Sequence, residues 1–361
     1  MSWKKIIKIL VAALILGGIA FGAYYFFRQS PTAQEFLGSV FPGTFKNGAG
    51  TGAVPLAGQK LKSLTEDAIF DYWINSKTGD VYYLNEAGQV FRLPENSPEL
   101  ANSQTLPKLN QISASSDGTY AVAKFNFPTL PTFSIFDTVT NSWQPLPPNT
   151  IAAAWSPNGP EISYVDDRAL KIFNLASKKT SEIIKLTQKE LMLHWRKDSR
   201  LFLTSLSGPS AKMMILDAKN KTLLPFLEEN GLVIQWSAND ELGIKLNSVN
   251  NRPQTSLIDG NGVTLSQLTF VTLPSKCLIE ELKIYCAVPK NIGEGLKLPE
   301  DYYKKAVYFD DTFYLINLSD GSVSELKSDL ELKIDAEHLE LRNNQLLFKN
   351  RLDSKLYSLG L

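Results

Sequence analysis

Short hydrophobic segments alternate with polar turns along most of the chain from about residue 68 onward. The clearest unit is Ile151–Trp155, an apolar segment that runs into the turn at Pro157, Asn158 and Gly159, after which a second alternating segment leaves. A tight turn between two such segments predicts a β-hairpin. Looser copies surround Trp195 and Trp236, and the three tryptophans stand 40 and 41 residues apart. The chain therefore contains an internal repeat of about 40 residues.

Each repeat continues with a second pair of strands, which a polar turn joins. The third strand ends in Asp or Asn, and we expect this side chain to accept hydrogen bonds from backbone amides of the turn. The residues are Asp137, Asn174, Asp217, Asp259 and Asn317. Four short antiparallel strands in about 40 residues are typical of a propeller blade. Seven such units predict an all-β, seven-bladed β-propeller.

The last unit, from Glu337 to Leu361, contains only three strand segments. An incomplete blade leaves an exposed sheet edge, which is a liability for a soluble domain. The segment Gln59–Leu64 lies just before the first blade and is placed to supply the missing strand. We expect it to pair with the last blade and close the ring.

The run from Trp155 to Tyr164 resembles the TolB-like, or PD40, repeat of bacterial propellers. That repeat reads apolar, Trp, Ser, Pro, Asp, Gly, followed by a strand with Tyr or Phe. The resemblance covers blades two to five by sequence and the other blades by length and pattern. It implies a WD40-like propeller that serves as a partner in periplasmic complexes or as a non-catalytic domain beside a peptidase. The complete layout is similar to that of uncharacterised bacterial membrane proteins that carry a propeller.

Peptidase chemistry is not supported by the sequence. A serine peptidase of the α/β-hydrolase type needs a Gly-x-Ser-x-Gly elbow, which does not occur here. A Ser-His-Asp triad also needs a histidine, and only His194 and His338 exist. Both lie in predicted strands of the repeat, so we interpret both as structural residues.

An enzyme centred on the propeller channel, such as a glycosidase or lyase, is the alternative hypothesis. Such an enzyme needs carboxylates that converge on the channel mouth. The inner strands instead appear in the sequence as runs of Ala, Leu, Ile and Ser. We therefore expect no catalytic residue.

The hydrophobic pattern differs at the N-terminus, where Ile9–Phe27 is a run of 19 uncharged, mostly apolar residues. As a helix it would span about 28 Å, close to the thickness of a bilayer core. Residues 1–28 are therefore predicted to be a membrane anchor. Residues 29–58, rich in Gly and Pro, are predicted to be a flexible tether to a propeller domain at 59–361.

Charge gives the anchor an orientation. The first 28 residues contain four basic and no acidic side chains, and the positive-inside rule then places the N-terminus in the cytoplasm and the propeller outside. We expect a single-pass protein of the cell membrane. The other interpretation is a cleaved signal peptide, which would release a periplasmic TolB-like component.

Composition narrows the chemistry further. The 361 residues carry 37 basic and 37 acidic side chains, which argues against a nucleic-acid binder. Two His and two Cys form no zinc-binding pattern, and neither a metal nor a cofactor is implied.

Cys277 and Cys286 occupy two strands that a tight turn joins, so antiparallel pairing can bring them opposite each other. Outside the cytoplasm such a pair oxidises. We expect a structural disulfide, and two free thiols are the alternative.

Two insertions lengthen the connection between the second and third strands of a blade, at 124–133 and at 289–305. In a propeller these connections emerge on one face, together with the links between blades. Long loops on a rigid scaffold often carry binding residues. The candidates are Phe125, Phe127, Tyr302, Tyr303 and Lys304. We expect a monomeric, non-catalytic platform that binds a cell-envelope protein or glycan, although the aromatic side chains could instead pack over blade edges.

Overall fold

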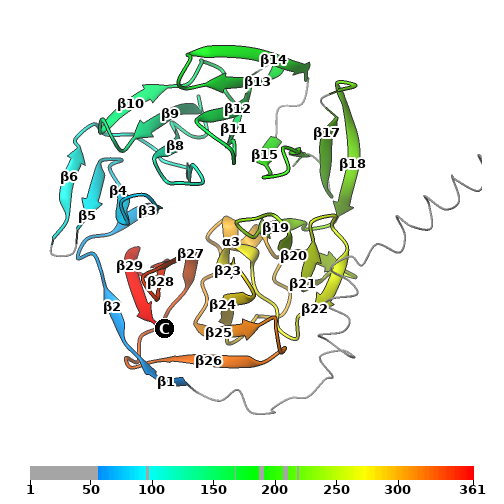
Figure 1. Cartoon of the computed structure of the whole chain (residues 1–361). Coiled ribbons are helices and arrows are strands. Elements are labelled where there is room, and N and C mark those ends of the chain that lie inside the picture. Colours follow the sequence, from blue (N-terminus) through cyan, green and yellow to red (C-terminus); the bar gives the residue numbers. More distant parts are fainter. Residues whose placement is uncertain (1–55, 95–96, 167, 187–190, 206–209, 218) are drawn as a thin grey trace, which may run out of the picture. The chain divides into compact units, whose positions relative to one another are not determined.

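The computed structural model describes residues 56–361 apart from 95–96, 167, 187–190, 206–209 and 218. The predicted membrane anchor at 9–27 and most of the tether lie outside the described residues. Within the described part, no helix is long and apolar enough to cross a bilayer. The described chain forms seven sheets, antiparallel except for one parallel edge strand, arranged as the blades of a propeller (Figure 1), which confirms the predicted fold.

Each blade consists of four consecutive strands or, at the ring closure, of strands from both ends of the described chain. Blades one to three contain β3 (Ile69–Asn75), β4 (Asp80–Asn85), β5 (Val90–Leu93), β6 (Glu99–Asn102), β7 (Gln111–Ala114), β8 (Tyr120–Phe125), β9 (Thr132–Asp137), β10 (Ser142–Pro145), β11 (Ala152–Trp155), β12 (Glu161–Val165), β13 (Ala169–Asn174) and β14 (Lys179–Lys185). Blades four and five contain β15 (Leu191–Trp195), β16 (Leu201–Ser205), β17 (Ala211–Asp217), β18 (Thr222–Glu229), β19 (Val233–Trp236), β20 (Leu242–Val249), β21 (Arg252–Asp259) and β22 (Thr264–Gln267).

Blades six and seven contain the last strands of the chain. Blade six contains the short helix η1 (Pro274–Lys276) at its entry, then β23 (Cys277–Glu280), β24 (Lys283–Pro289), the helix α3 (Glu300–Tyr303), β25 (Asp311–Asn317) and β26 (Val323–Ser328). Blade seven contains β27 (Ala336–Arg342), β28 (Gln345–Asn350) and β29 (Lys355–Gly360).

The repeated tryptophan ends the first strand of its blade and connects that blade to a neighbour. Trp155, the last residue of β11, is buried, and its Nε1 donates a hydrogen bond of 2.8 Å to the carbonyl of Ser113 in blade two. Its ring also stacks on Tyr120 of that blade. A large apolar side chain with one polar atom suits this position because it fills the space between blades and satisfies a backbone carbonyl.

The Asp or Asn that ends the third strand behaves as predicted. In five blades its Oδ1 accepts a hydrogen bond from a backbone amide of the following turn, at 2.8–3.0 Å. The five residues are Asp137, Asn174, Asp217, Asp259 and Asn317.

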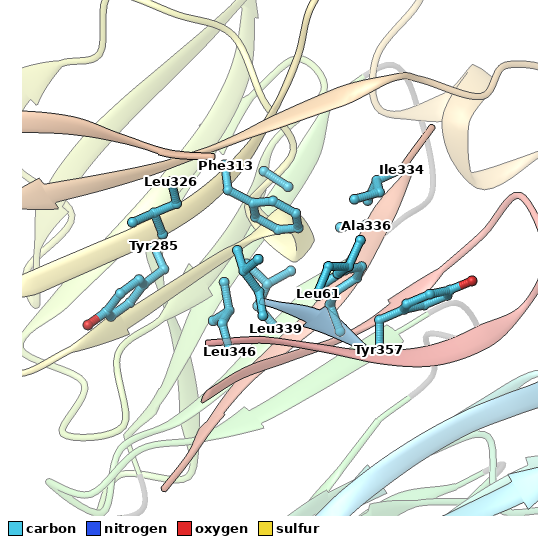
Figure 2. Close-up of a cluster of buried hydrophobic side chains, with 12 residues drawn as sticks. Leu61, Tyr285, Phe313, Leu326, Ile334, Ala336, Leu339, Leu346 and Tyr357 are labelled. Atoms are coloured by element: carbon cyan, nitrogen blue, oxygen red, sulfur yellow. The ribbon is translucent and has the colours of Figure 1, made fainter. Parts of the chain in front are cut away.

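The ring closes through the N-terminal part of the described chain. Strand β2 (Leu61–Ser63) pairs antiparallel with β29, with Leu61 opposite Leu359, and so supplies the fourth strand of blade seven. This confirms the closure predicted from the incomplete last blade. Leu61 enters a buried cluster shared by blades six and seven (Figure 2), where Phe313, Leu339 and Tyr357 also lie.

A second N-terminal strand was not predicted. Strand β1 (Leu56–Gln59) pairs in parallel with β26 and adds a fifth strand to blade six. The amide of Leu61 then donates a hydrogen bond of 2.8 Å to the Oδ1 of Asp329. The chain entering the propeller is therefore held by two adjacent blades.

Candidate functional site

The longest connection in the described propeller joins β24 to β25 and spans residues 290–310. Its helix α3 places Tyr302 in the interior, where the side chain is 1% exposed and stacks on Phe309 with 5.6 Å between ring centroids. Leu246 of blade five and Leu273 of the following link pack in the same cluster. The insertion therefore has its own small core and is not a loose loop.

A buried lysine fixes the base of this insertion. The Nζ of Lys276 donates to the Oδ2 of Asp311 at 2.6 Å, to the Oδ1 of Asp335 at 2.5 Å and to the carbonyl of Ala336 at 2.9 Å. The side chains of the lysine and both aspartates are fully buried. Burial raises the pKa of Asp311 to about 6, although the Lys276 ammonium opposes this shift. Charges at such depth are tolerated only when they are paired and hydrogen-bonded.

Blade seven supplies the other half of the network. The guanidinium of Arg351 lies over the ring of Tyr302 at 3.7 Å, and its Nη1 lies 3.0 Å from the Oδ2 of Asp335. The hydroxyl of Tyr302 donates to the Oδ1 of Asp335 at 3.1 Å. Burial raises the pKa of Tyr302 well above its ordinary value, so the phenol remains protonated. We call Lys276, Asp311, Asp335, Tyr302 and Arg351 the buried ionic network.

The surface of the blade-six insertion, outside its small core, is exposed to solvent and partly apolar. Tyr303 is 51% exposed, and Lys304 is also exposed. Tyr308 is exposed on the same insertion, and Leu330 is exposed on the link that leads from blade six to blade seven. We call the surface of Tyr303, Lys304, Tyr308, Leu330 and Leu332 the blade six–seven corner.

A cavity of about 480 Å³ lies beside this link. Its walls include the apolar side chains of Phe313, Leu326 and Ile334. Asp310 and Asp311 also line it, and each has an Oδ1 that is buried and has no hydrogen-bond partner among the described residues.

The structure does not bring the five predicted binding residues together. Phe125 is buried at the end of β8, whereas Phe127 is 43% exposed, and both belong to blade two. The Nζ of Lys124 lies 5.2 Å from the ring centre of Phe127, and burial lowers the pKa of this lysine. Blades three to five separate this loop from the insertion of blade six. Of the predicted residues, Phe127, Tyr303 and Lys304 present their side chains to solvent.

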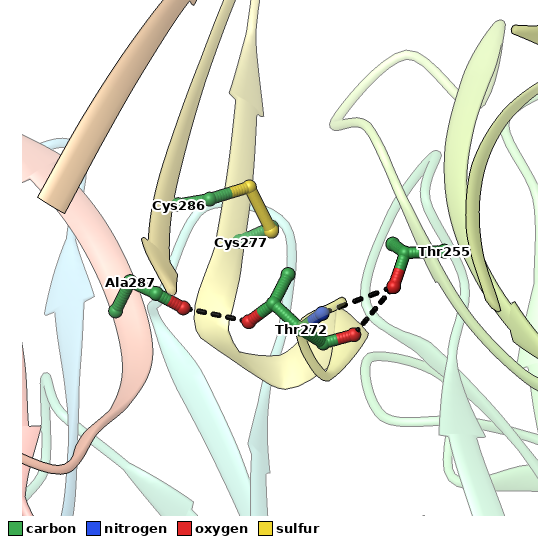
Figure 3. Close-up of a disulfide and its surroundings, with 5 residues drawn as sticks. All are labelled: Thr255, Thr272, Cys277, Cys286 and Ala287. Carbon is green, nitrogen blue, oxygen red and sulfur yellow. Dashed lines mark hydrogen bonds between the residues drawn. A yellow bond between two sulfur atoms is a disulfide. The ribbon is translucent and has the colours of Figure 1, made fainter. Parts of the chain in front are cut away.

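The predicted disulfide is present. Cys277 on β23 and Cys286 on β24 are directly opposite in register and are bonded, with Cα atoms 4.2 Å apart (Figure 3). Beside it, Thr272 donates its hydroxyl to the carbonyl of Ala287 at 2.6 Å and exchanges two hydrogen bonds with Thr255 of blade five. These bonds hold the link that carries Lys276 against two blades.

A second ionisable group lies on inner strands, where the sequence interpretation expected small and apolar residues. The Nδ1 of His338 on β27 lies 2.6 Å from the Oδ1 of Asp71 on β3, and its Nε2 lies 3.6 Å from Glu340. The hydroxyl of Tyr72 donates to the carbonyl of His338 at 2.6 Å. The inner strands therefore do carry carboxylates, and the expectation of only Ala, Leu, Ile and Ser there was wrong.

Irregular strands explain why the pattern hid these residues. His338 has a left-handed φ of 54°, and the register of β27 shifts between Glu337 and Glu340. The register of β3 also shifts, between Ile69 and Asp71. A bulge turns side chains to a different face, and an alternating pattern read along the sequence cannot locate it. The acidic residues flanking His338 were the available signal.

Both histidines lie on inner strands, as the repeat predicted. His194 on β15 faces Asp240 of blade five, with Nε2 and Oδ1 3.0 Å apart. Within the described ranges, no group of three or more His, Cys, Asp or Glu side chains is arranged to hold a metal ion.

Solved structures of other proteins share the fold. Virginiamycin B lyase from Staphylococcus aureus aligns with a TM-score of 0.55 and 13% identity, over 84% of this chain and 99% of the lyase. A prolyl endopeptidase structure aligns with a TM-score of 0.52 and 12% identity, over 91% of this chain and 52% of that chain. TolB from Acinetobacter baumannii aligns at 0.46 and 12% identity, over 72% of this chain.

These similarities show the propeller fold alone, because all identities are below 15%. The seven sheets and the alignment with the lyase confirm the propeller fold that the resemblance implied. This chain spans 63% of the length of TolB and 34% of the length of the tricorn protease, another similar structure. No protein-family model and no curated protein sequence matches this chain.

Proposed function

We propose that this protein is a non-catalytic binding platform of the cell envelope, anchored in the membrane through residues 9–27 and exposing its propeller outside the cytoplasm. The partner is a protein, and the blade six–seven corner is the contact surface. The propeller holds this surface in a fixed shape, and the tether lets it approach the partner in different orientations.

The distribution of exposed apolar side chains carries this proposal. Among the described residues, fourteen large hydrophobic side chains are exposed. Eight of them lie in or next to connections between second and third strands or in links between blades, which emerge on one face of a propeller. These are Phe127, Leu130, Val249, Tyr303, Tyr308, Leu330, Leu332 and Leu352. Apolar side chains gathered on one face are typical of protein interaction sites.

The rigidity of the insertion supports the same conclusion. Binding loses affinity when loops must become ordered on contact. Here the buried ionic network and the stacked ring of Tyr302 hold the insertion before any partner arrives. Tyr303 and Tyr308 are thus presented on a preformed surface, and Tyr is enriched in protein interfaces.

Two observations support a location outside the cytoplasm. The Cys277–Cys286 disulfide is of the kind that persists in oxidising compartments. The N-terminal sequence combines four basic residues with a long apolar run, which favours export of the chain that follows.

The alternative of a channel enzyme has less support. His338 is the obvious candidate base, but carboxylates face both of its ring nitrogens, at 2.6 and 3.6 Å. Such a histidine is held in its protonated form and is a poor base.

The test is a crosslinking pull-down from native membranes with tagged full-length protein. Deleting the insertion would remove the buried Tyr302, so point substitutions are preferable. The test variant is Tyr303→Ser/Tyr308→Ser/Leu330→Ser. The matched control is Val139→Ser/Val263→Ser/Leu282→Ser, which alters three exposed apolar side chains in turns of the other face.

We expect a discrete partner with the wild type and the control, and its loss with the test variant. Equal capture by both variants would place the contact elsewhere on the protein. Absence of a partner with every form would argue against the platform and return attention to the enzyme hypothesis.

A further inference from the structure

The buried ionic network places an amine directly against two carboxyl groups in the protein interior. The Nζ of Lys276 lies 2.6 Å from the Oδ2 of Asp311 and 2.5 Å from the Oδ1 of Asp335, and all three side chains are fully buried. The rings of Tyr302 and Phe309 flank the amine, with centroids 5.0 and 5.6 Å from Nζ. Such surroundings disfavour separated charges and favour transfer of a proton from the ammonium to a carboxylate, which leaves both groups neutral.

The two aspartates differ in their partners. Asp335 is paired with a second cation, because the Nη1 of Arg351 lies 3.0 Å from its Oδ2. Among the described residues, Lys276 is the only cation paired with Asp311, and the Oδ1 of Asp311 is buried there without a hydrogen-bond partner. Burial raises the pKa of Asp311 to about 6. Asp311 is therefore the carboxyl group that takes the proton from the ammonium.

Hydrogen bonds orient the amine toward Asp311. Besides the two carboxylates, the Nζ of Lys276 donates to the carbonyl of Ala336 at 2.9 Å. Once one proton has moved to Asp311, the two remaining N–H groups can still donate to Asp335 and Ala336, so the nitrogen lone pair faces the carboxyl group of Asp311. A neutral lysine amine is a nucleophile. Its target, the Cγ of Asp311, is one bond beyond the oxygen that contacts Nζ, and a fixed arrangement of reacting groups lowers the barrier to attack.

We propose that Lys276 and Asp311 condense to form an isopeptide bond between Nζ and Cγ, with Asp335 as the catalytic base. The nitrogen lone pair attacks Cγ and forms the C–N bond, and Nζ gives a second proton to the Oδ1 of Asp335. Asp335 passes that proton to the Oδ2 of Asp311, to which the backbone amide of Ala336 also donates at 2.8 Å. The bond between Cγ and Oδ2 breaks, and the oxygen leaves as water with both protons. The third proton stays on the new amide, and Asp335 is a carboxylate again.

The product fits these surroundings better than the ion pair does. One neutral amide replaces two buried charges, and Asp335 keeps Arg351 as its partner. The Oδ1 of Asp311 becomes an amide oxygen, which costs less to bury without a partner than a carboxylate oxygen. The bond joins positions 35 residues apart and encloses the insertion of blade six. It would therefore fix the base of the blade six–seven corner in addition to the disulfide.

Peptide mapping of the full-length protein tests the bond. The protein is kept overnight near pH 6, where the carboxyl group of Asp311 titrates, and is then unfolded, reduced and digested with trypsin. A free Lys276 gives the separate peptides 246–276 and 306–327. A linked Lys276 resists trypsin, so we expect residues 246–283 joined to 306–327 in a product that is one water lighter, by about 18 Da, than the two peptides together.

Three variants assign the roles. Lys276→Arg keeps a cation but cannot form this amide, so the free peptide 306–327 should appear. Asp335→Asn keeps both reacting groups but cannot accept the proton, so the linked fraction should fall at least about tenfold, provided that its melting temperature shows a folded protein. Lys290→Arg is the matched control, because the Lys290–Asp310 pair is partly exposed and lies outside the network, and it should be linked as fully as the wild type.

The wild-type digest decides the proposal whatever the stability of the variants. Recovery of only the free peptides 246–276 and 306–327 would overturn the isopeptide bond and leave the network purely ionic. Attachment of Lys276 to the peptide 334–342 would show that Asp335 is the electrophile and would overturn the assigned roles. Equal linkage in the wild type and in a folded Asp335→Asn would reject Asp335 as the base. None of these results depends on a binding partner, so they test the bond separately from the proposed platform.

Discussion

The imidazole of His338 and the carboxylate of Asp71 are joined at 2.6 Å across the boundary between the last and first blades, although 267 residues separate them in the chain. Glu340 faces the other ring nitrogen at 3.6 Å, and Lys349 acts electrostatically on Asp71. Glu337 on the same strand is paired with Lys349 at 3.1 Å. The seam where the ring closes is therefore held by charges on its inner strands and by β2 on its outer side.

Stability of the seam should depend on pH. Burial opposes protonation of His338, but Asp71 and Glu340 together outweigh it, so the pKa of His338 rises well above its ordinary value of 6.5. The pKa of Asp71 lies below its ordinary value of 3.8, because His338 outweighs the opposite effect of burial. A raised histidine pKa stabilises the fold fully below 6.5 and loses this effect as the pH rises through the folded value. The lowered pKa of Asp71 stabilises the fold above pH 3.8, and this contribution is lost as the pH falls through the folded value.

We therefore expect the seam to be strongest between about pH 4 and 6.5. The substitution Asp71→Asn should lower the free energy of unfolding by about 1–2 kcal/mol in that window. The effect is modest because His338 and Asp71 are both partly exposed, and water weakens the pair. The difference in free energy of unfolding from the wild type should shrink as the pH rises from 6.5 toward the folded pKa of His338. Urea denaturation from pH 4 to 9 measures it. A difference that stays constant over this range would show that the pair is not ionic.

The disulfide should contribute to the stability of blade six. Cys277 and Cys286 close a loop of nine residues, and the chain-entropy model then predicts about 2–3 kcal/mol. The free energy of unfolding of the double variant Cys277→Ser/Cys286→Ser, measured by urea denaturation, should be lower by this amount. Dithiothreitol should lower the stability of the wild type but not that of the variant. Thiol titration of the unfolded, unreduced protein provides the check, because two reactive thiols would contradict the bond.

Substitution of Lys276 should lower the stability of the protein more than most other single substitutions. Lys276→Met would leave Asp311 and Asp335 buried without their ammonium partner, a change that costs about 3–5 kcal/mol in other buried pairs. Lys212→Met is the matched control, since the Lys212–Glu228 pair is largely exposed, and it should change stability little. Thermal denaturation compares the two variants. Similar melting temperatures would mean that the network is hydrated in solution.

The closing strand provides a further test. Leu61 is 4% exposed and packs in the cluster between blades six and seven, so Leu61→Ala should lower the free energy of unfolding by about 2–3 kcal/mol. Lys62→Ala, on the exposed position next to it, should have almost no effect. Chemical denaturation measures both. An equal effect of the two substitutions would argue that β2 is not docked as described.

The candidate surface shows which structural features a sequence pattern can predict and which it cannot. The lengthened connection in blade six was predicted correctly, and so was the pair Cys277–Cys286, because both depend on residues within one hairpin. Tyr302 and Tyr303 look equivalent in the sequence, yet one is buried and the other is half exposed. Their difference follows from α3, which turns Tyr302 toward Asp335 and Arg351 of other elements.

The amino-acid sequence by itself determined the blade, because its alternation, its turns and its tryptophan spacing act between residues that are close in the chain. It also determined that the last blade needs a strand from elsewhere. Only the tertiary structure decided that Asp71 meets His338, that Lys276 is buried between two aspartates, and that β1 joins blade six. These contacts depend on ring closure and on bulges, which bring distant residues into register and which no local pattern encodes.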